Sequence, residues 1–414
     1  MITTSSPPIS PPRPVPQLSV AAAVAASAVA APEAIAVVDG EGRAWTWEDL
    51  AVAAAEIVIE LTERGIGPGD RVAVFAPSSS ASRVAAWVAV WALTAVLVTV
   101  DADLPPDHRG AVLARTTPAR LLTPGPDAPE AAVPVTRLAG DHPYPGRSWD
   151  AAGWAHRVLL AAGEPNPLTA AYLHHRSLDT GYLIGAARTL AHAATWMRAT
   201  TGATAGDRVA HVGPVESDLA LYTTWMALTS GAALYLPPPD LHGAQALEWA
   251  AAQQITIITA TSGQSWFGRD PSVSEPRSSA MRTLLLFGAP TPVAHLARWR
   301  RYGARAITTV LATPVTGICC AHTMSRAPAG QWCPLGTGID DTIRITIAAP
   351  NGRCCAEGST GLVMLSSRHG ALDAIDIGAA GQRIHLGPRR ARHQTRITGY
   401  INDTVLYPRP ERGR

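Results

Sequence analysis

The chain has 414 residues, a formal net charge of +2 and 47% apolar residues. Enough apolar side chains are present for a large core, which excludes an intrinsically disordered chain, and the near-neutral charge gives no support to nucleic-acid binding. All 34 basic residues are arginine, so the chain has no lysine to form a Schiff base or to clamp a phosphate.

The N-terminal segment is predicted to be a disordered, Pro/Ser-rich tail over residues 1–17. An apolar run at 18–31 follows, and its Ala28-Val29-Ala30 imitates the cleavage site of a secretory signal peptide. Only Pro32 and Glu33 separate this run from the next predicted strand, so we expect an Ala-rich first helix of a cytoplasmic protein. The run is also too short to span a bilayer, and we expect no membrane partner.

The first predicted unit covers residues 18–145 and alternates strands with helices. Thr46 is the expected N-cap of a helix, and Trp87 and Trp91 are expected to pack in the core from one helix face. Strands are predicted at 34–38, 44–46, 71–76 and 95–100, and helices at 47–64, 79–93 and 108–116. This alternation predicts βαβ units and a mainly parallel sheet. Residues 123–145 are rich in Pro, Gly and Asp and indicate a connecting region.

The second predicted unit covers residues 146–333 and continues the alternation. A buried strand at 168–173 leads through Ser177, Thr180, Gly181 and Gly185 into a helix at 186–200. Small residues of this kind let backbone amides approach phosphate oxygens, so the stretch is predicted to be a phosphate-binding loop. Further strands are predicted at 208–212, 232–236, 255–259, 282–287 and 306–311, with helices at 219–230, 244–254 and 292–302.

From residue 334 the pattern changes to short strands and turns, with strands predicted at 343–347, 361–365, 382–386 and 394–398. Residues 334–406 are therefore predicted to form a small β-rich subdomain, followed by a tail at 407–414.

The chain resembles adenylate-forming enzymes, in particular the amino-acid-activating adenylation domains of nonribosomal peptide synthetases. The resemblance rests first on WTWEDL at 45–50, GPGDRVAV at 67–74 and VDADLP at 100–105, in that order and spacing. It implies an α/β fold with two doubly wound αβ subdomains and a small β-rich subdomain. The family's mobile C-terminal domain, with its catalytic lysine, has almost no counterpart here. In the family's hinge motif, Arg392 replaces the aspartate.

The resemblance also implies a nucleotide site, but with key groups replaced. The family's phosphate loop TSGSTGxPKG aligns with 176–185, where Leu178 replaces a glycine and Ile184 the lysine. The motif YGPTE falls on 311–315, where Val315 replaces the magnesium-binding glutamate. The residues carried over to nucleotide binding are Ser177, Thr180, Gly181, Gly185, Gly288, Thr316 and Asp373, the last as the ribose ligand.

A substrate site is implied by the motif FDxS, whose amine-binding aspartate falls on Asp218. Leu219 and Tyr222 follow on the same predicted helix, and Val310, Ile318 and Cys319 match positions that line the family's side-chain pocket. Two alternatives remain open: Asp218 could act only as a helix N-cap, and the apolar residues could be ordinary core.

Other chemically distinctive groups have plainer interpretations. His174, His175, Arg176 and Asp179 could form an acid/base site but are expected to be a solvated loop at a cleft mouth. The cluster Arg389, Arg390, Arg392 and Arg396 could meet an acidic carrier protein, with a solvated surface as the default. The five cysteines show no CxxC spacing and are expected to be core residues, so no metal ligand is predicted.

Three functional hypotheses follow. The first is a degenerate adenylation-like protein in natural-product (for example antibiotic) biosynthesis that no longer forms acyl-adenylates. It would bind an amino-acid-like ligand, associate with a carrier protein or another biosynthetic protein, or use the old pocket for a new reaction, without a bound cofactor. The second is an active ligase that uses ATP and Mg²⁺ and is completed by a C-terminal domain in trans. The third is a structural interaction protein with a collapsed cleft.

Overall fold

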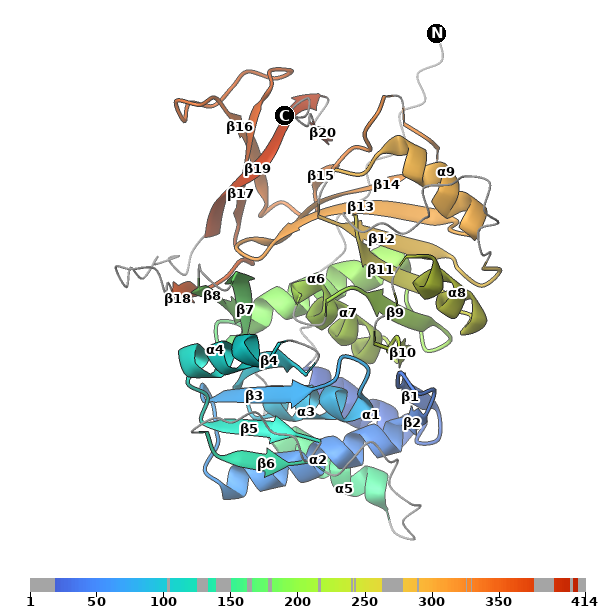
Figure 1. Cartoon of the computed structure of the whole chain (residues 1–414), viewed down its shortest axis with the longest axis vertical. Helices are drawn as coiled ribbons and strands as arrows, with labels where there is room; N and C mark the ends of the chain where they lie inside the picture. Colours follow the sequence, from blue (N-terminus) through green and yellow to red (C-terminus); the bar gives the residue numbers. More distant parts are fainter. Residues whose placement is uncertain are drawn as a thin grey trace.

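The computed structural model describes residues 19–102, 105–124, 133–138, 150–161, 166–177, 181–214, 217–239, 241, 243–262, 278–288, 290–324, 326–328, 330–375, 391–402 and 405–408. Within these ranges the chain forms three sheets, with helices packed on both faces of the two larger ones, and the α/β class with a β-rich addition is confirmed. Figure 1 shows the first sheet at the bottom, the second above it, and the β-rich unit at the upper left.

The first sheet has seven strands in the order β18-β8-β7-β4-β3-β5-β6. Its two faces follow from the alternation of side chains along a strand, since Val72 and Val74 enter the large central core whereas Ala73 and Phe75 enter a second cluster on the opposite face. Both faces are therefore covered, as in a doubly wound sheet. Its strands are β3 (Arg71–Ala76), β4 (Val96–Asp101), β5 (Arg120–Thr123), β6 (Val135–Arg137), β7 (Ala170–Ser177), β8 (Gly181–Ala186) and β18 (Asp373–Ile375).

Five helices accompany this sheet: α1 (Val20–Ala30), α2 (Trp47–Glu63), α3 (Ala81–Ala92), α4 (Pro106–Thr116) and α5 (Ala151–Ala161). The expected first helix is confirmed as α1, whose N-cap is Ser19 and whose inner face is buried in the central core. Thr46 caps α2 as predicted, because its hydroxyl accepts from the Asp49 amide while the Asp49 carboxylate accepts from the Thr46 amide. No helix in the described part of the chain is long and apolar enough to cross a membrane.

The second sheet has nine strands in the order β15-β14-β13-β12-β11-β9-β10-β1-β2. Helices α6 (Ala187–Thr201) and α7 (Asp218–Thr229) lie between the two large sheets (Figure 1), whereas α8 (Ala244–Ala252) and α9 (Val293–Tyr302) contribute to a separate cluster on the other face. The strands are β1 (Ile35–Val38), β2 (Ala44–Thr46), β9 (Arg208–Val212), β10 (Ala233–Tyr235), β11 (Ile257–Thr261), β12 (Thr283–Phe287), β13 (Ala306–Thr313), β14 (Gly317–Met324) and β15 (Thr337–Gly338).

The third sheet is antiparallel and comprises β16 (Arg344–Ala348), β17 (Gly361–Ser367), β19 (Ala391–Asn402) and β20 (Val405–Pro408) in that order. It corresponds to the predicted β-rich region, and the strand predicted at 382–386 lies outside the described residues. Strand pairing crosses the predicted unit boundaries, because β1 pairs with β10 of the second sheet and β18 pairs with β8 of the first.

Asp207 and Arg282 form a partly buried ion pair that joins the end of α6 to β9 and β12. The Arg282 Nε donates to Asp207 Oδ1 at 2.8 Å and Nη2 donates to Oδ2 at 2.7 Å, which is the bidentate geometry. Burial alone raises the pKa of the Asp207 carboxyl, but hydrogen bonds from Arg282, Thr204 and Thr256 lower this pKa to about 2. The ionised carboxylate therefore stabilises the fold.

We expect Asp207→Asn to lower the free energy of unfolding by about 2 kcal/mol at pH 7, because a buried charged hydrogen-bonding partner is lost. A folded pKa below the unfolded value means that this contribution is present above about pH 4 and fades as the pH falls towards 2. Urea unfolding at pH 7 and at pH 3 measures both effects. Asp150→Asn is the control, since its pair with Arg157 is exposed and should contribute almost nothing. Equal midpoints for Asp207→Asn and the wild type at pH 7 would contradict the assignment.

Candidate functional site

The predicted phosphate loop is the end of a β-hairpin. Tyr172 of β7 pairs with Gly185 of β8, and Ser177 pairs with Gly181, while Thr180 lies outside the described residues. The prediction that the loop leads directly into a helix is wrong, because β8 intervenes and α6 begins only at Ala187. Glycines that resemble a phosphate cradle in the sequence are strand residues here.

Tyr172 explains why Gly185 has no side chain. A Cβ built on Gly185 would lie 2.1 Å from atoms of the Tyr172 ring, which packs directly across it from the neighbouring strand. Sequence reasoning missed Tyr172 as a site residue, since a Tyr–Gly pair on adjacent strands becomes visible only once the register of the hairpin is known. Gly185 therefore has a packing role that needs no phosphate.

The two positions at which the related enzymes carry charge are in apolar surroundings. Ile184 is half-buried and packs against the cluster that contains Phe75 and Tyr182. Val315 is buried against Leu183 and Ala371. Backbone bonds fix this arrangement, because the Ala371 amide donates to the Val315 carbonyl at 2.8 Å and the Leu372 amide donates to the Ile184 carbonyl at 2.8 Å. Neither of these two positions therefore presents a charged side chain to a phosphate or a magnesium ion.

The remaining predicted nucleotide residues lie at separate points around the hairpin. Asp373 on β18 pairs through its backbone with Ile184, which places it beside the former phosphate loop. Gly288 follows β12 with a φ of 101°, a conformation that favours glycine, and its amide donates to the Val310 carbonyl at 3.1 Å. Thr316 is fully buried in the turn between β13 and β14, where its hydroxyl lies 2.7 Å from the Thr313 hydroxyl and accepts from Cys319 Sγ at 3.0 Å.

Asp218 occupies the first turn of α7 and is buried. The alternative that it is the N-cap is wrong, since Ser217 is the N-cap and its Oγ accepts from the Ala220 amide at 3.2 Å. Asp218 faces two buried tyrosines, Tyr172 and Tyr222, whose hydroxyl oxygens are 3.4 Å apart. Burial and the nearby Asp218 charge raise the pKa of both phenols well above 10, so both hydroxyls stay protonated.

The predicted substrate residues are brought together in the protein interior. Leu219, Tyr222, Val310 and Ile318 belong to one apolar core with Tyr172, which is consistent with either a pocket wall or plain packing. Cys319 is fully buried beside them, and burial raises the pKa of its thiol to about 12, so it is not a nucleophile at neutral pH. Cys320 and Cys333 are buried core residues as predicted, whereas Cys354 is exposed.

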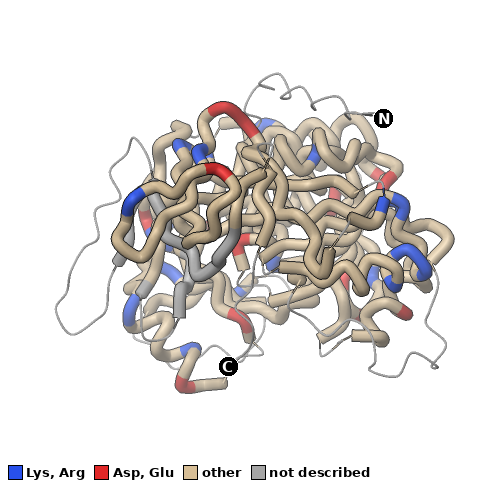
Figure 2. Tube along the Cα trace, turned by 90° about the horizontal axis from the view of Figure 1, so that it is seen from above, with Lys and Arg blue, Asp and Glu red and all other residues tan. Residues whose placement is uncertain are grey.

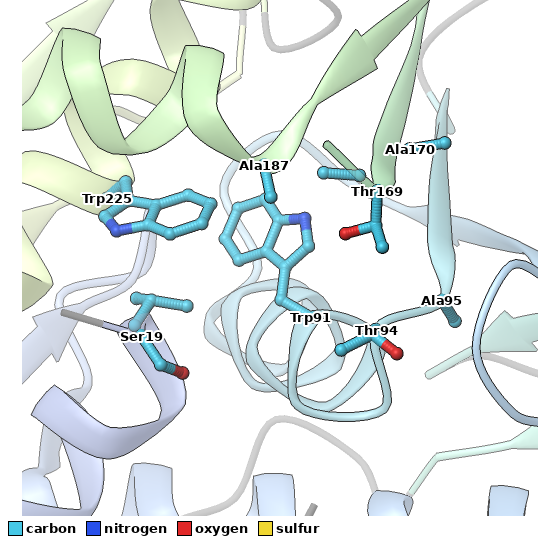
Figure 3. Close-up of a pocket in the computed structure, with 10 residues that line it drawn as sticks. Ser19, Trp91, Thr94, Ala95, Thr169, Ala170, Ala187 and Trp225 are labelled. Carbon is cyan, nitrogen blue, oxygen red and sulfur yellow. The ribbon is translucent and has the colours of Figure 1, made fainter. Parts of the chain in front are cut away.

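Two hollows adjoin this site without overlapping it. The one in Figure 3 lies between α1, α3 and β7, where the indole rings of Trp91 and Trp225 are 5.0 Å apart between centroids. Its volume of about 10 Å³ suffices for one water at most, so it is not a substrate site. A larger groove of about 350 Å³ lies between α6 and α7, and Arg198, Thr204 and Trp225 line it.

The two polar clusters named in the sequence analysis cannot be placed on the surface of the described structure. The side chains of His174, His175, Arg176, Asp179 and the cluster at 389–396 lie outside the described residues. In Figure 2 the basic and acidic residues are scattered in short segments, and long neutral segments separate them. This distribution agrees with the near-neutral net charge.

Comparisons with known proteins agree with this geometry. The family model described as AMP-binding enzyme matches residues 24–372. Pyochelin synthetase PchF of Pseudomonas aeruginosa is 30% identical over 293 residues, covering 68% of this chain and 15% of that protein. The L-proline–[L-prolyl-carrier protein] ligase of Pseudomonas fluorescens is 27% identical over 348 residues, or 80% of this chain and 68% of that protein.

Solved structures resemble the fold as a whole. The nonribosomal peptide synthetase FmoA3 superposes with a TM-score of 0.80 at 20% identity, over 97% of this chain and 43% of that one. VinN superposes with a TM-score of 0.72 at 19% identity, over 94% of this chain and 98% of that one. At these identities the likeness shows the fold alone, and the chain spans only a small part of PchF.

We expect Gly185→Ala to lower the free energy of unfolding by about 1–3 kcal/mol, because the new methyl group would overlap the Tyr172 ring. The matched control is Gly110→Ala in α4, where nothing lies near the added methyl and alanine is the better helix former. Thermal and urea unfolding of both variants measure the difference. A Gly185→Ala variant as stable as Gly110→Ala would show that the ring does not pack there.

Proposed function

Because the chain belongs to the AMP-binding enzyme family, we propose that it is an adenylation-like protein that binds an amino-acid-like ligand without forming acyl-adenylates. It would serve a natural-product pathway of the nonribosomal peptide type in the cytoplasm, as a binding or carrier-associated component. The nonribosomal peptide synthetase relatives support the pathway class.

The observation that carries the loss of adenylation is the apolar packing at Ile184 and Val315. Adenylation needs positively charged groups next to the negative phosphates of ATP. The chain contains no lysine to supply one of them. One preorganised group of this kind typically contributes about 2.7–4 kcal/mol to the transition state. Losing the lysine and the metal carboxylate together should lower the rate by several orders of magnitude, even if the two effects are not additive.

Ligand binding is supported by the surroundings of Asp218. A buried carboxylate beside two protonated tyrosine hydroxyls can pair with an ammonium group, and the hydroxyls add hydrogen bonds without adding negative charge. Leu219, Val310 and Ile318 would face an apolar side chain. Among the relatives, one is named as an L-proline ligase and VinN has been solved with L-aspartate, which supports a free amino acid as the ligand class.

A carrier protein is the proposed partner. One similar structure, NpsA–ThdA, is an adenylation domain fused to a peptidyl carrier protein, and it superposes with a TM-score of 0.71 at 16% identity. The loading reaction would then be carried out by another protein.

Two other candidates have an observation in their favour. An active ligase completed in trans is favoured by Asp373, which lies beside the hairpin as a ribose ligand would require. A purely structural protein is favoured by the complete burial of Tyr222, Val310 and Cys319.

ATP–pyrophosphate exchange and calorimetry with a panel of free amino acids, including L-proline and L-aspartate, separate the three candidates. We expect no exchange above background, and binding of at least one amino acid but not of its N-acetyl derivative. Exchange at ordinary enzymatic rates would contradict the proposal. Binding of MgATP without any pyrophosphate exchange would favour the ligase completed in trans. Absence of binding by every amino acid would favour the structural candidate.

Asp218→Asn should weaken binding of that amino acid by about ten- to a hundredfold, because a charged hydrogen bond contributes about 1.5–3 kcal/mol. Ser217→Ala is the matched control, since it removes the N-cap hydroxyl of α7 but keeps the charge. It should lower stability by about 1 kcal/mol and leave the affinity unchanged. Equal affinities for Asp218→Asn and the wild type would place the ligand elsewhere.

A further inference from the structure

Two histidines and an aspartate meet where α6 contacts the β-rich unit. His192 lies on α6, Asp340 follows β15, and His369 follows β17. One ligand atom from each side chain lies within 4.8 Å of the other two. His192 Nε2 is 2.6 Å from Asp340 Oδ2, and His369 Nε2 is 3.8 Å from the same oxygen. None of these residues stood out in the sequence, because they come from three distant segments.

The aspartate is held so that one oxygen faces both imidazoles. Asp340 Oδ1 accepts from the Thr342 amide and from the Thr342 hydroxyl, each at 2.7 Å. This leaves Oδ2 directed at His192 and His369. Second-shell hydrogen bonds of this kind orient the carboxylate ligands of metal sites.

Hydrogen bonds hold the His369 backbone, whereas its ring nitrogen Nδ1 makes none among the described residues. Its amide donates to Ser367 Oγ at 3.0 Å, and its carbonyl accepts from Thr189 Oγ1 at 2.6 Å. In contrast, its buried Nδ1 has no hydrogen-bond partner among the described residues. No hydrogen bond at Nδ1 therefore has to be broken when the ring rotates about its terminal torsion, which is broad for histidine.

The geometry points to a divalent metal site of the zinc class, with His192, Asp340 and His369 as protein ligands and water as the fourth. Two imidazoles and one carboxylate form the ligand set of open zinc sites. Metal–ligand distances of about 2.0–2.2 Å place tetrahedral ligands about 3.3 Å apart, between the two distances seen here. The side chains are 18–25% exposed, so an ion and a water can enter. This inference is independent of the proposed function.

Binding requires two local rearrangements: the 2.6 Å hydrogen bond between His192 Nε2 and Asp340 Oδ2 opens to about 3.3 Å, and the His369 ring rotates. The two imidazole rings are stacked, with centroids 3.7 Å apart and planes 4° apart, so their lone pairs run parallel and do not converge. Rotation of the His369 ring brings its lone pair towards the point between His192 and Asp340.

Cobalt(II) is the probe, because tetrahedral Co²⁺ has strong visible absorption that does not depend on enzyme activity. The untagged full chain is stripped with EDTA, titrated with Co²⁺, and then with Zn²⁺. We expect one equivalent of Co²⁺ with a tetrahedral spectrum, its displacement by Zn²⁺, and a higher melting temperature with Zn²⁺. An octahedral Co²⁺ spectrum would overturn the inference, and so would binding of less than half an equivalent of Co²⁺. The three side chains would then be a hydrogen-bonded cluster that holds no metal.

Variants locate the ion. His192→Gln and His369→Gln should each weaken binding at least tenfold, and Thr342→Val should weaken it about tenfold while leaving all three ligands in place. His295→Gln, which changes a partly buried histidine on α9, is the matched control and should bind as the wild type does. Cys354→Ser/Cys355→Ser removes the accessible thiols as a competing site. Unchanged binding in both histidine variants, or loss of binding in the cysteine variant, would refute the site.

Discussion

The Tyr172 ring packed across Gly185 is the contact on which the organisation of this protein depends. Tyr172 belongs to β7, which pairs with β4 on one side and β8 on the other. Its hydroxyl reaches Tyr222 on α7, a helix that packs on the second sheet. One side chain thus connects the hairpin, the first sheet and the helical layer, and the hairpin cannot shift without disturbing the central core.

The position of the hairpin also determines which surroundings each side chain of β8 faces. Side chains on β8 alternate, so Ile184 faces the cluster around Phe75 while Leu183 faces Val315 and Ala371. The two positions that the motif resemblance assigns to charged residues are therefore occupied by the half-buried Ile184 and the buried Val315. A charge restored by a single substitution would be placed in apolar surroundings, where an unpaired ion is strongly disfavoured. A single lysine or glutamate substitution at Ile184 or Val315 would therefore have to overcome this packing.

Local sequence signals predicted the elements that depend on local physics. The spans of β2, β3 and β9, the N-cap at Thr46 and the buried Trp87–Trp91 pair all follow from periodicity and end signals. Helix α5 and strands β5, β6, β14, β15, β18 and β20 were missed. Strand β8 was taken for a loop because its two glycines imitate a phosphate cradle. Pairing between β1 and β10, or between β18 and β8, joins residues far apart in the chain, and no local pattern specifies it. Of the candidate site, the placement of Asp218 beside Leu219 and Tyr222 was visible in the sequence, but the partnership with Tyr172 was not.

Helix α6 is the element through which the hairpin and the histidine–aspartate cluster are related. It begins directly after β8, so its first residue is positioned by the strand that carries Ile184. Thr189, whose hydroxyl donates to the His369 carbonyl, and His192 are three positions apart on α6, so less than one helical turn spans both contacts with the β-rich unit. An α-helix is stiff over so short a length. A change at the cluster that moves His192 or the His369 backbone must therefore either break the Thr189 hydrogen bond or displace the start of α6. Displacement of the start of α6 would move the end of β8, which lies beside Tyr172 in the hairpin.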